Sequence, residues 1–264
     1  MKNITILVNY KGYFETKHKP IPYEGGMDLE IIKSTFEQYN YKPKLLRLFD
    51  LDFNKSYKDD IFIYTSSEDI DSFYKDYIED VILMLTLNGA TVIPGYEFLR
   101  AHNNKVFMEL LGKKFKDTVL KSFSFGTVED LQLFLGENPV NYPLVVKAAK
   151  GAVSSGVKLA RNKKELIKKA KILSNSKNVK NDVIDLIRSF RHKNYILESR
   201  YRRKFLIQEF IPNLKNDWKV YFFGNRLYIW YRYVRKNDFR ASGSGLFEFN
   251  EEVPIPEGLL NFAQ

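Results

Sequence analysis

The sequence predicts an α/β protein in which a parallel-sheet domain precedes a module of mixed strands and helices. Three observations support this prediction. Short β-prone runs alternate with amphipathic helical stretches over residues 1–100, as in a parallel sheet. Residues 101–206 continue with helices and strands, among them a hairpin around a loop of small residues. Residues 207–264 begin with long β-prone runs, two of which are joined by the turn Gly224-Asn225. We therefore expect three parts with these boundaries.

The N-terminal part shows the periodicity of both element types. Leu29, Ile32 and Phe36 recur at helical spacing, and Gly89 follows a second apolar helix, as a glycine at a helix end often does. Pro94 stops the last short strand because it has no amide donor. The expected strands are Ile4–Val8, Lys44–Leu48, Asp60–Tyr64 and Thr91–Ile93, and the expected helices are Met27–Tyr39 and Phe73–Asn88.

The rest of the chain contains helices with recognisable caps. Thr127 and Asn162 stand where a side-chain oxygen can accept from the first free amides of a helix. The expected helices are Asn103–Leu111, Thr127–Leu135, Lys163–Leu173 and Asp182–Phe190, with a further one starting in Ile255–Ala263. The expected strands are Leu120–Phe125, Leu144–Lys147, Val157–Ala160, Phe205–Phe210, Trp218–Phe223 and Leu227–Tyr233.

Composition excludes several classes of protein. The 264 residues contain no cysteine, which excludes disulfides, thiolate metal sites and a cysteine nucleophile. The N-terminus has no apolar core of signal-peptide length, and no run approaches the roughly 18 apolar residues of a membrane span. We expect a cytoplasmic protein without a membrane partner. The three histidines lack metal spacing, so we expect no metal ligand within the chain.

Positive charge is concentrated in one region. The net charge is +10, and residues 157–206 hold 16 Lys and Arg against 4 Asp and Glu. Such an excess suits anionic partners, namely nucleotides, phosphorylated sugars, nucleic acid or a membrane surface. A solvated helical face is the plainer interpretation of this run.

A loop of small residues follows the strand that ends in Lys147. Glycine and serine let main-chain amides approach an anion, and Lys147 can place an ammonium on the same anion. The sequence lacks the ending of a Walker loop. An ordinary surface hairpin is the alternative interpretation. The candidate anion-binding residues of this loop are Lys150, Gly151, Ser154, Ser155 and Gly156.

A second candidate segment runs from Phe205 to Val220. Its strand ends just before Pro212, so the main-chain groups before the proline are open to another partner, such as an adenine ring. Asp217 offers a carboxylate for ribose hydroxyls, and Lys219 follows on the same strand face. A plain strand end with exposed polar residues is the alternative. The candidate adenine contacts are Gln208, Glu209, Phe210 and Ile211.

A third segment, Tyr231–Gly245, gathers arginines with serine and glycine. Arg232, Arg235 and Arg240 could bind phosphate through paired hydrogen bonds. A basic hairpin edge that prevents edge pairing is the alternative.

These segments, in this order and spacing, resemble the ATP-grasp superfamily, especially its peptide-ligase and glutamate-ligase-like branch. The resemblance covers roughly residues 100–250. Lys147 matches the family's phosphate-binding lysine, and Asn104-Lys105 matches the start of its ATP module. Ser242 stands where the family often has asparagine. The resemblance implies an α+β grasp fold after the N-terminal parallel α/β domain.

The resemblance also implies a function. ATP would phosphorylate a substrate carboxylate to an acylphosphate, which an amine or a thiol then attacks. Lys105 and Lys147 would hold the α- and β-phosphates, and the loop over Lys150–Gly156 would close on the γ-phosphate. Residues Gln208–Ile211 would read adenine, with Asp217 and Lys219 nearby. Arg232 and Arg240 would be the catalytic residues that neutralise the acylphosphate.

One departure from the family concerns magnesium. The family's metal-binding carboxylates follow the arginine strand, and no such motif lies among the glutamates after Gly245. We expect the module to be incomplete at the C-terminus, the Mg²⁺ ligands to lie beyond Gln264, and this chain to be inactive alone. Two other functions stay open: a nucleotide-binding regulatory protein without catalysis, and a nucleic-acid-binding module, the less favoured of the two. The oligomeric state also stays open, with a homodimer as one option.

Overall fold

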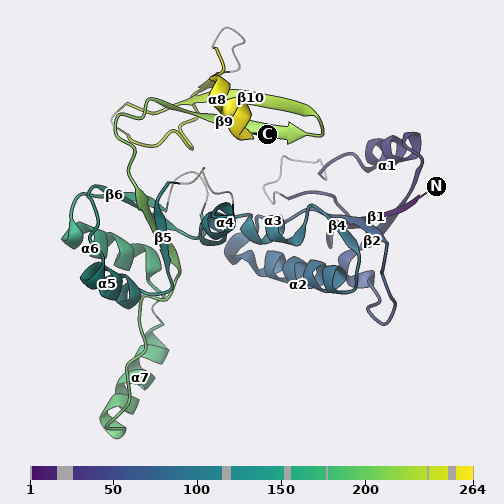
Figure 1. The fold of residues 1–264 in the computed structure, drawn as a ribbon. Helices are drawn as coiled ribbons and strands as arrows, with labels where there is room; N and C mark the ends of the chain where they lie inside the picture. The colour runs from purple at the N-terminus through teal and green to yellow at the C-terminus, as the bar shows by residue number, and fades with distance from the viewer. Residues whose placement is uncertain are drawn as a thin grey trace. The chain divides into compact units, whose positions relative to one another are not determined.

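The computed structural model describes residues 2–16, 26–114, 120–151, 156–176, 178–236, 238–248 and 254–263 (Figure 1). The chain forms two compact units, Met1–His102 and Asn103–Gln264. The finer division at residue 206 stays a prediction.

Unit 1 is built on a four-stranded sheet in the order β2-β1-β3-β4. All three strand pairings are parallel, as the alternation of strands and helices predicts. The strands are β1 (Lys2–Val8), β2 (Tyr41–Arg47), β3 (Ile61–Ile63) and β4 (Thr91–Ile93), and the helices are α1 (Leu29–Gln38), α2 (Phe73–Leu87) and α3 (Tyr96–Ala101). The short helix α3 is not among the predicted elements.

Apolar side chains cover both faces of this sheet. Ile6 and Val8 of β1 pack with Leu29 and Phe36 on one face. The other face carries a larger cluster, formed by β strands, α2 and α3, whose central member Ile82 has no exposed surface. Figure 1 shows α1 and α2 on opposite faces of the sheet. Unit 1 is thus an α/β layer structure, which confirms the predicted fold class for the N-terminal part.

Unit 2 contains two antiparallel sheets, in the orders β5-β8-β6-β7 and β11-β10-β9. Its strands are β5 (Ser122–Phe125), β6 (Leu144–Ala148), β7 (Val157–Ala160), β8 (Phe205–Glu209), β9 (Asn216–Phe223), β10 (Arg226–Tyr233) and β11 (Phe247–Glu248). Its helices are α4 (Lys105–Gly112), α5 (Val128–Glu137), α6 (Lys163–Ser174), α7 (Val179–Arg191) and α8 (Glu257–Ala263). None of the helices in the described parts of the chain is long and apolar enough to cross a membrane.

Strand β8 lies in the middle of its sheet and separates two environments. Phe205 and Ile207 point to the helices α5 and α6 and join the core there. Leu206 packs on the other face with Val106 of α4. Each of these three strand residues has no exposed surface, and burial of such a side chain contributes about 1.5–3 kcal/mol. The face that does not carry α5 and α6 is where polar residues of β6 and β8 can form a site.

The predicted helix caps are present. Thr127 forms a capping box with Asp130 at the start of α5, and Asn162 accepts from the Glu165 amide at the start of α6. Helix α7 begins earlier than the predicted Asp182, because Asn178 accepts from the Asn181 amide and caps it.

Candidate functional site

A cavity of about 380 Å³ lies in unit 2, on the sheet face that does not carry α5 and α6. It is bordered by α4, the sheet strands β6 to β8, and the segments that follow β8 and β10. Its walls combine lysine ammonium groups, polar side chains and apolar surface. The lining residues are Lys105, Met108, Leu120, Val145, Lys147, Gly151, Val157, Gln208, Glu209, Phe210, Ile211, Leu214, Asp217, Phe239, Arg240, Ala241 and Ser242.

Lys105 is the first residue of α4 and is held beside the loop after β6. Its amide donates to the Ala149 carbonyl at 2.9 Å, and its Nζ donates to the Gly151 carbonyl at 2.5 Å. The Gly151 amide donates to Asn103 Oδ1 at 3.1 Å. This amide of the small-residue loop is therefore used within the protein, whereas the resemblance assigns the loop to a phosphate.

Lys147 lies on β6 and belongs to a buried polar network. Its Nζ donates to Gln208 Oε1, and Gln208 Nε2 lies 3.3 Å from both carboxylate oxygens of Glu109. The Ser122 hydroxyl donates to the same carboxylate at 3.1 Å. Gln208 and Ser122 are buried, and such groups are costly to leave without partners. The network therefore fixes the position of the Lys147 ammonium.

The charged forms of Lys105 and Lys147 are both disfavoured by burial. Burial lowers the pKa of Lys147 below its ordinary value, and the carboxylate of Glu109 acts in the opposite direction. Burial also lowers the pKa of Lys105, and the positive charge of Lys147 lowers that pKa further. Two ammonium groups from different elements thus face one cavity and repel each other. An anion between them would offset both effects.

The end of β8 supplies a different kind of surface. Strand pairing ends at Glu209 with its partner Leu144, so Phe210 and Ile211 lie outside the ladder. The Phe210 ring contacts the Phe239 ring, with centroids 6.1 Å apart. Together with the other apolar lining residues, these rings form walls suited to a flat aromatic ligand.

Asp217 lines the cavity and is held by an arginine. Arg232 donates from Nε and Nη2 to the two carboxylate oxygens of Asp217, each at 2.6 Å. The two residues face each other across the β9–β10 hairpin. Asp217 is among the residues that line the cavity, and Arg232 is not.

Arg240 lines the cavity and is held by Asp238. The arginine Nε and Nη2 donate to the Asp238 carboxylate, each at 2.8 Å. These hydrogen bonds lower the pKa of Asp238 to about 2 and raise that of Arg240. The guanidinium is therefore fixed at the wall formed by residues 239–242.

Three other predicted residues do not line the cavity. Lys219 lies over two aromatic rings of the hairpin, 4.6 Å from the centroid of Tyr221 and 5.4 Å from that of Trp230. Gly156 accepts from the Ala148 amide at 2.8 Å, and Lys150 is exposed. Ser154 and Ser155 lie outside the described residues. The proposed closing of this loop over a phosphate stays a prediction.

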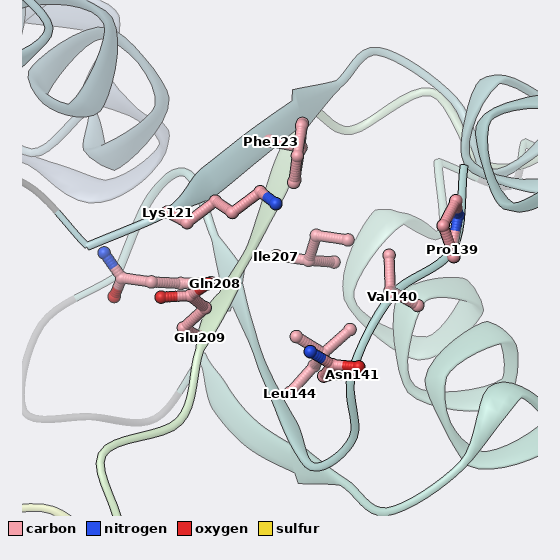
Figure 2. A pocket seen from close by; sticks show the side chains of 9 residues that line it. All are labelled: Lys121, Phe123, Pro139, Val140, Asn141, Leu144, Ile207, Gln208 and Glu209. Atoms are coloured by element: carbon pink, nitrogen blue, oxygen red, sulfur yellow. The ribbon is translucent and has the colours of Figure 1, made fainter.

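A second, smaller cavity borders the same strand. It has about 60 Å³ and is lined by Phe123, Ile207 and residues before β6. Figure 2 shows Ile207 and Gln208 on opposite sides of β8. This cavity is too small for a nucleotide, since small-molecule sites usually have about 300–1,000 Å³.

Several contributors were not among the predicted site residues. Glu109 of α4 contacts Gln208, and Ser122 of β5 donates to Glu109; only the fold brings these residues together. The pairing of Asp217 with Arg232 could have been predicted from the sequence. The two-residue turn Gly224-Asn225 sets the register of the β9–β10 hairpin, and this register places the two residues opposite each other. Within the described ranges, no group of three or more His, Cys, Asp or Glu side chains lies close enough to hold a metal ion.

No protein-family model and no curated protein matches this sequence. Three similar solved structures are a RimK-domain ATP-grasp protein from Sphaerobacter thermophilus, an N5-carboxyaminoimidazole synthetase from Staphylococcus aureus in complex with ADP, and a D-alanine–D-alanine ligase from Bacillus anthracis. Their sequence identities are 12%, 13% and 14%, and their TM-scores 0.40, 0.43 and 0.43. The matches cover 83%, 89% and 99% of this chain.

The same matches cover 68%, 55% and 75% of the other chains, so this chain spans about half the length of the Staphylococcus aureus protein. The Sphaerobacter thermophilus protein is an ATP-grasp protein, and this chain is similar in structure to it, to the synthetase and to the ligase.

Proposed function

We propose that unit 2 binds ATP in the 380 Å³ cavity and that the protein is an ATP-dependent ligase. The observation that carries this proposal is the pair Lys105 and Lys147. Both ammonium groups are partly or largely removed from solvent, face one cavity, and have lowered pKa values, in the case of Lys105 partly because of the other lysine. Polyphosphate contacting both would remove the repulsion between them, since opposite charges favour the charged form of a lysine.

The rest of the cavity fits a nucleoside. Phe210 and Phe239 offer apolar walls for a base, and the strand end at Glu209 offers main-chain groups outside the ladder. Asp217 offers a carboxylate for ribose hydroxyls while its charge is balanced by Arg232. The volume lies within the usual range for small-molecule sites, about 300–1,000 Å³.

In the proposed reaction, ATP supplies a phosphoryl group that converts a substrate carboxylate into an acylphosphate, and an amine or a thiol displaces the phosphate. The protein acts mainly by position and charge in such transfers. Lys105 and Lys147 would bind phosphate oxygens, and Arg240, fixed by Asp238, would offset charge at the reacting group. Arg232 would orient Asp217 rather than touch the substrate.

Magnesium usually accompanies ATP in these reactions. The described residues contain no carboxylate cluster that fits it, so we assign no step to the metal. We also propose that the protein is located in the cytoplasm.

Thermal unfolding with ADP and with ATP tests the proposal. A ligand that binds only the native state at 100 times its Kd raises the free energy of unfolding by about 2.7 kcal/mol. Lys147→Met should remove most of the ligand-induced rise in Tm, while Lys158→Met, a lysine of β7 outside the cavity, should keep it. No rise with either nucleotide, or equal loss in both variants, contradicts the assignment. ADP release from ATP in the presence of carboxylates and amines would contradict both the expectation that this chain is inactive alone and the regulatory alternative.

A further inference from the structure

Residues 175–204 form an arm between α6 and β8, with α7 as its main element. No residue of α7 is buried, and Figure 1 shows the helix extending away from α5, α6 and the sheet. The two ends of the arm are held together. The Arg203 amide donates to the Ser174 carbonyl at 3.0 Å, and the Ser176 amide donates to the Arg200 carbonyl at 2.9 Å.

An apolar stripe runs along one side of α7. Its members recur at spacings of four, three, one and three residues, which places them within an arc of about 100°. A helix with this pattern normally buries the stripe, yet here it faces solvent. The exposed fractions are 67% for Val179, 52% for Val183, 47% for Leu186, 45% for Ile187 and 84% for Phe190.

The acidic residues of α7 are used within the arm. Asp185 accepts from the Tyr195 hydroxyl and from the Glu198 amide at 2.9 Å, and Asp182 lies 3.4 Å from Arg200 Nε. The returning segment 193–203 therefore covers the acidic side of the helix. Leu186 lines a cavity of about 290 Å³ with this segment, and the rest of the apolar stripe and the basic residues beside it stay open to a partner.

The charge of the arm is strongly positive. Residues 176–204 contain nine Lys and Arg but three Asp and Glu. By helical geometry, Lys180 and Arg191 border the stripe on the side away from the returning segment. A strongly amphipathic helix with basic flanks and a bulky apolar face is typical of helices that lie in a membrane surface.

We propose that α7 binds in the surface of a bilayer that contains anionic lipids. A flat membrane surface fits α7 better than a protein groove that would enclose the helix, because the returning segment 193–203 already covers one side of α7. A second copy of the arm would bring another large positive charge against the first. Nucleic acid would neutralise the charge but leave Val183 and Phe190 in water. This peripheral contact departs from the expectation that the protein has no membrane partner.

Co-sedimentation of the full chain with vesicles tests the proposal. Vesicles of phosphatidylcholine with about one-third phosphatidylglycerol should bind at least about tenfold more tightly than phosphatidylcholine alone, because each basic residue near an anionic surface adds to binding. Phe190→Asp should reduce binding at least about tenfold, while Leu133→Asp, at an exposed leucine of α5, should leave it unchanged. An unchanged Tm would show that both variants fold.

Charge is tested separately by a matched pair. Lys180→Glu with Arg191→Glu should abolish the preference for anionic vesicles, and Lys163→Glu with Lys164→Glu, on the exposed start of α6, should keep most of it. Absence of binding, equal binding to both vesicle types, or equal loss in both members of a pair overturns the proposal. A dimer of the wild type that Phe190→Asp converts to a monomer would assign the stripe to a second copy instead.

Discussion

The ammonium of Lys147 donates a hydrogen bond to the side-chain oxygen of Gln208, and this contact joins the two halves of the cavity. The lysine belongs to the anion side on β6, and the glutamine lies next to the strand end that borders the apolar walls. Because Gln208 also contacts Glu109, its amide orientation is fixed by one acceptor and one donor. We therefore expect changes at Gln208 to affect both stability and nucleotide binding.

Gln208→Met should lower the free energy of unfolding by about 1–3 kcal/mol, because it takes a hydrogen-bond partner from two buried or partly buried groups. Nucleotide affinity should fall as well. Urea unfolding and ADP titration measure the two effects. Gln132→Met, at an exposed position of α5, should change stability by less than about 0.5 kcal/mol. Similar losses in both variants would mean that the network does not hold the site.

Nucleotide binding should take up protons at alkaline pH. The pKa values of Lys105 and Lys147 lie below the ordinary value of 10.5 in the free protein, and a bound polyphosphate would raise them. Between the free and bound pKa values, binding therefore adds protons, and affinity falls as pH rises through the lowered values. Calorimetry of ADP binding at several alkaline pH values below 10.5, in two buffers of different ionisation enthalpy, measures the uptake.

Lys147→Met should reduce this proton uptake and Lys158→Met should not. Uptake that is the same in all three proteins would show that the lysines of the cavity do not contact the phosphates.

The pair of Asp217 and Arg232 should be energetically coupled. Its hydrogen bonds are bidentate, but the side chains are 32% and 23% exposed, so we expect a coupling of about 0.5–1 kcal/mol in the free energy of unfolding. A double-mutant cycle with Asp217→Asn and Arg232→Gln measures it. The pair Glu30 and Lys33 on α1, where the glutamate is 82% exposed, should give less than about 0.5 kcal/mol.

Arg232 should also act on ligand binding through Asp217. Arg232→Gln should weaken ADP binding in the presence of Asp217 and have little further effect in Asp217→Asn. A full additional loss in that background would mean that Arg232 touches the ligand directly.

Acid should weaken the Asp238–Arg240 contact. The pKa of Asp238 is lowered to about 2 by Arg240, so the stabilisation is fully present above 3.8, the ordinary aspartate value, and is lost as pH falls through about 2. Asp238→Asn should lower the free energy of unfolding by about 1 kcal/mol at neutral pH, with the difference from wild type vanishing near pH 2. Urea unfolding at several pH values tests this. In the Arg240→Gln background, the effect of Asp238→Asn on the free energy of unfolding should depend much less on pH.

Much of this fold could be predicted because its signals are local. Thr127 and Asn162 cap the helices that follow them, and the turn Gly224-Asn225 fixes the hairpin. Strand alternation also places Lys147 and Gln208 on faces opposite to Val146 and Ile207. The position of β8 between β5 and β6 could not be predicted in this way, because it depends on pairing between distant segments. Glu109 was missed for the same reason.

The two ends of the arm at residues 175–204 lie within a hydrogen bond of each other, through Ser174 with Arg203 and Ser176 with Arg200. The part between Ser176 and Arg200 could be replaced by a short turn, while Tyr201, which packs against the core beside α6, would stay in place. The length of the replaced part has little effect on the cost of closing the loop. The arm is therefore an insertion that can vary independently of the domain that carries it. Related chains could lose it, lengthen it or exchange its helix while the cavity stays intact, and a protein engineer could graft it onto another pair of neighbouring chain ends.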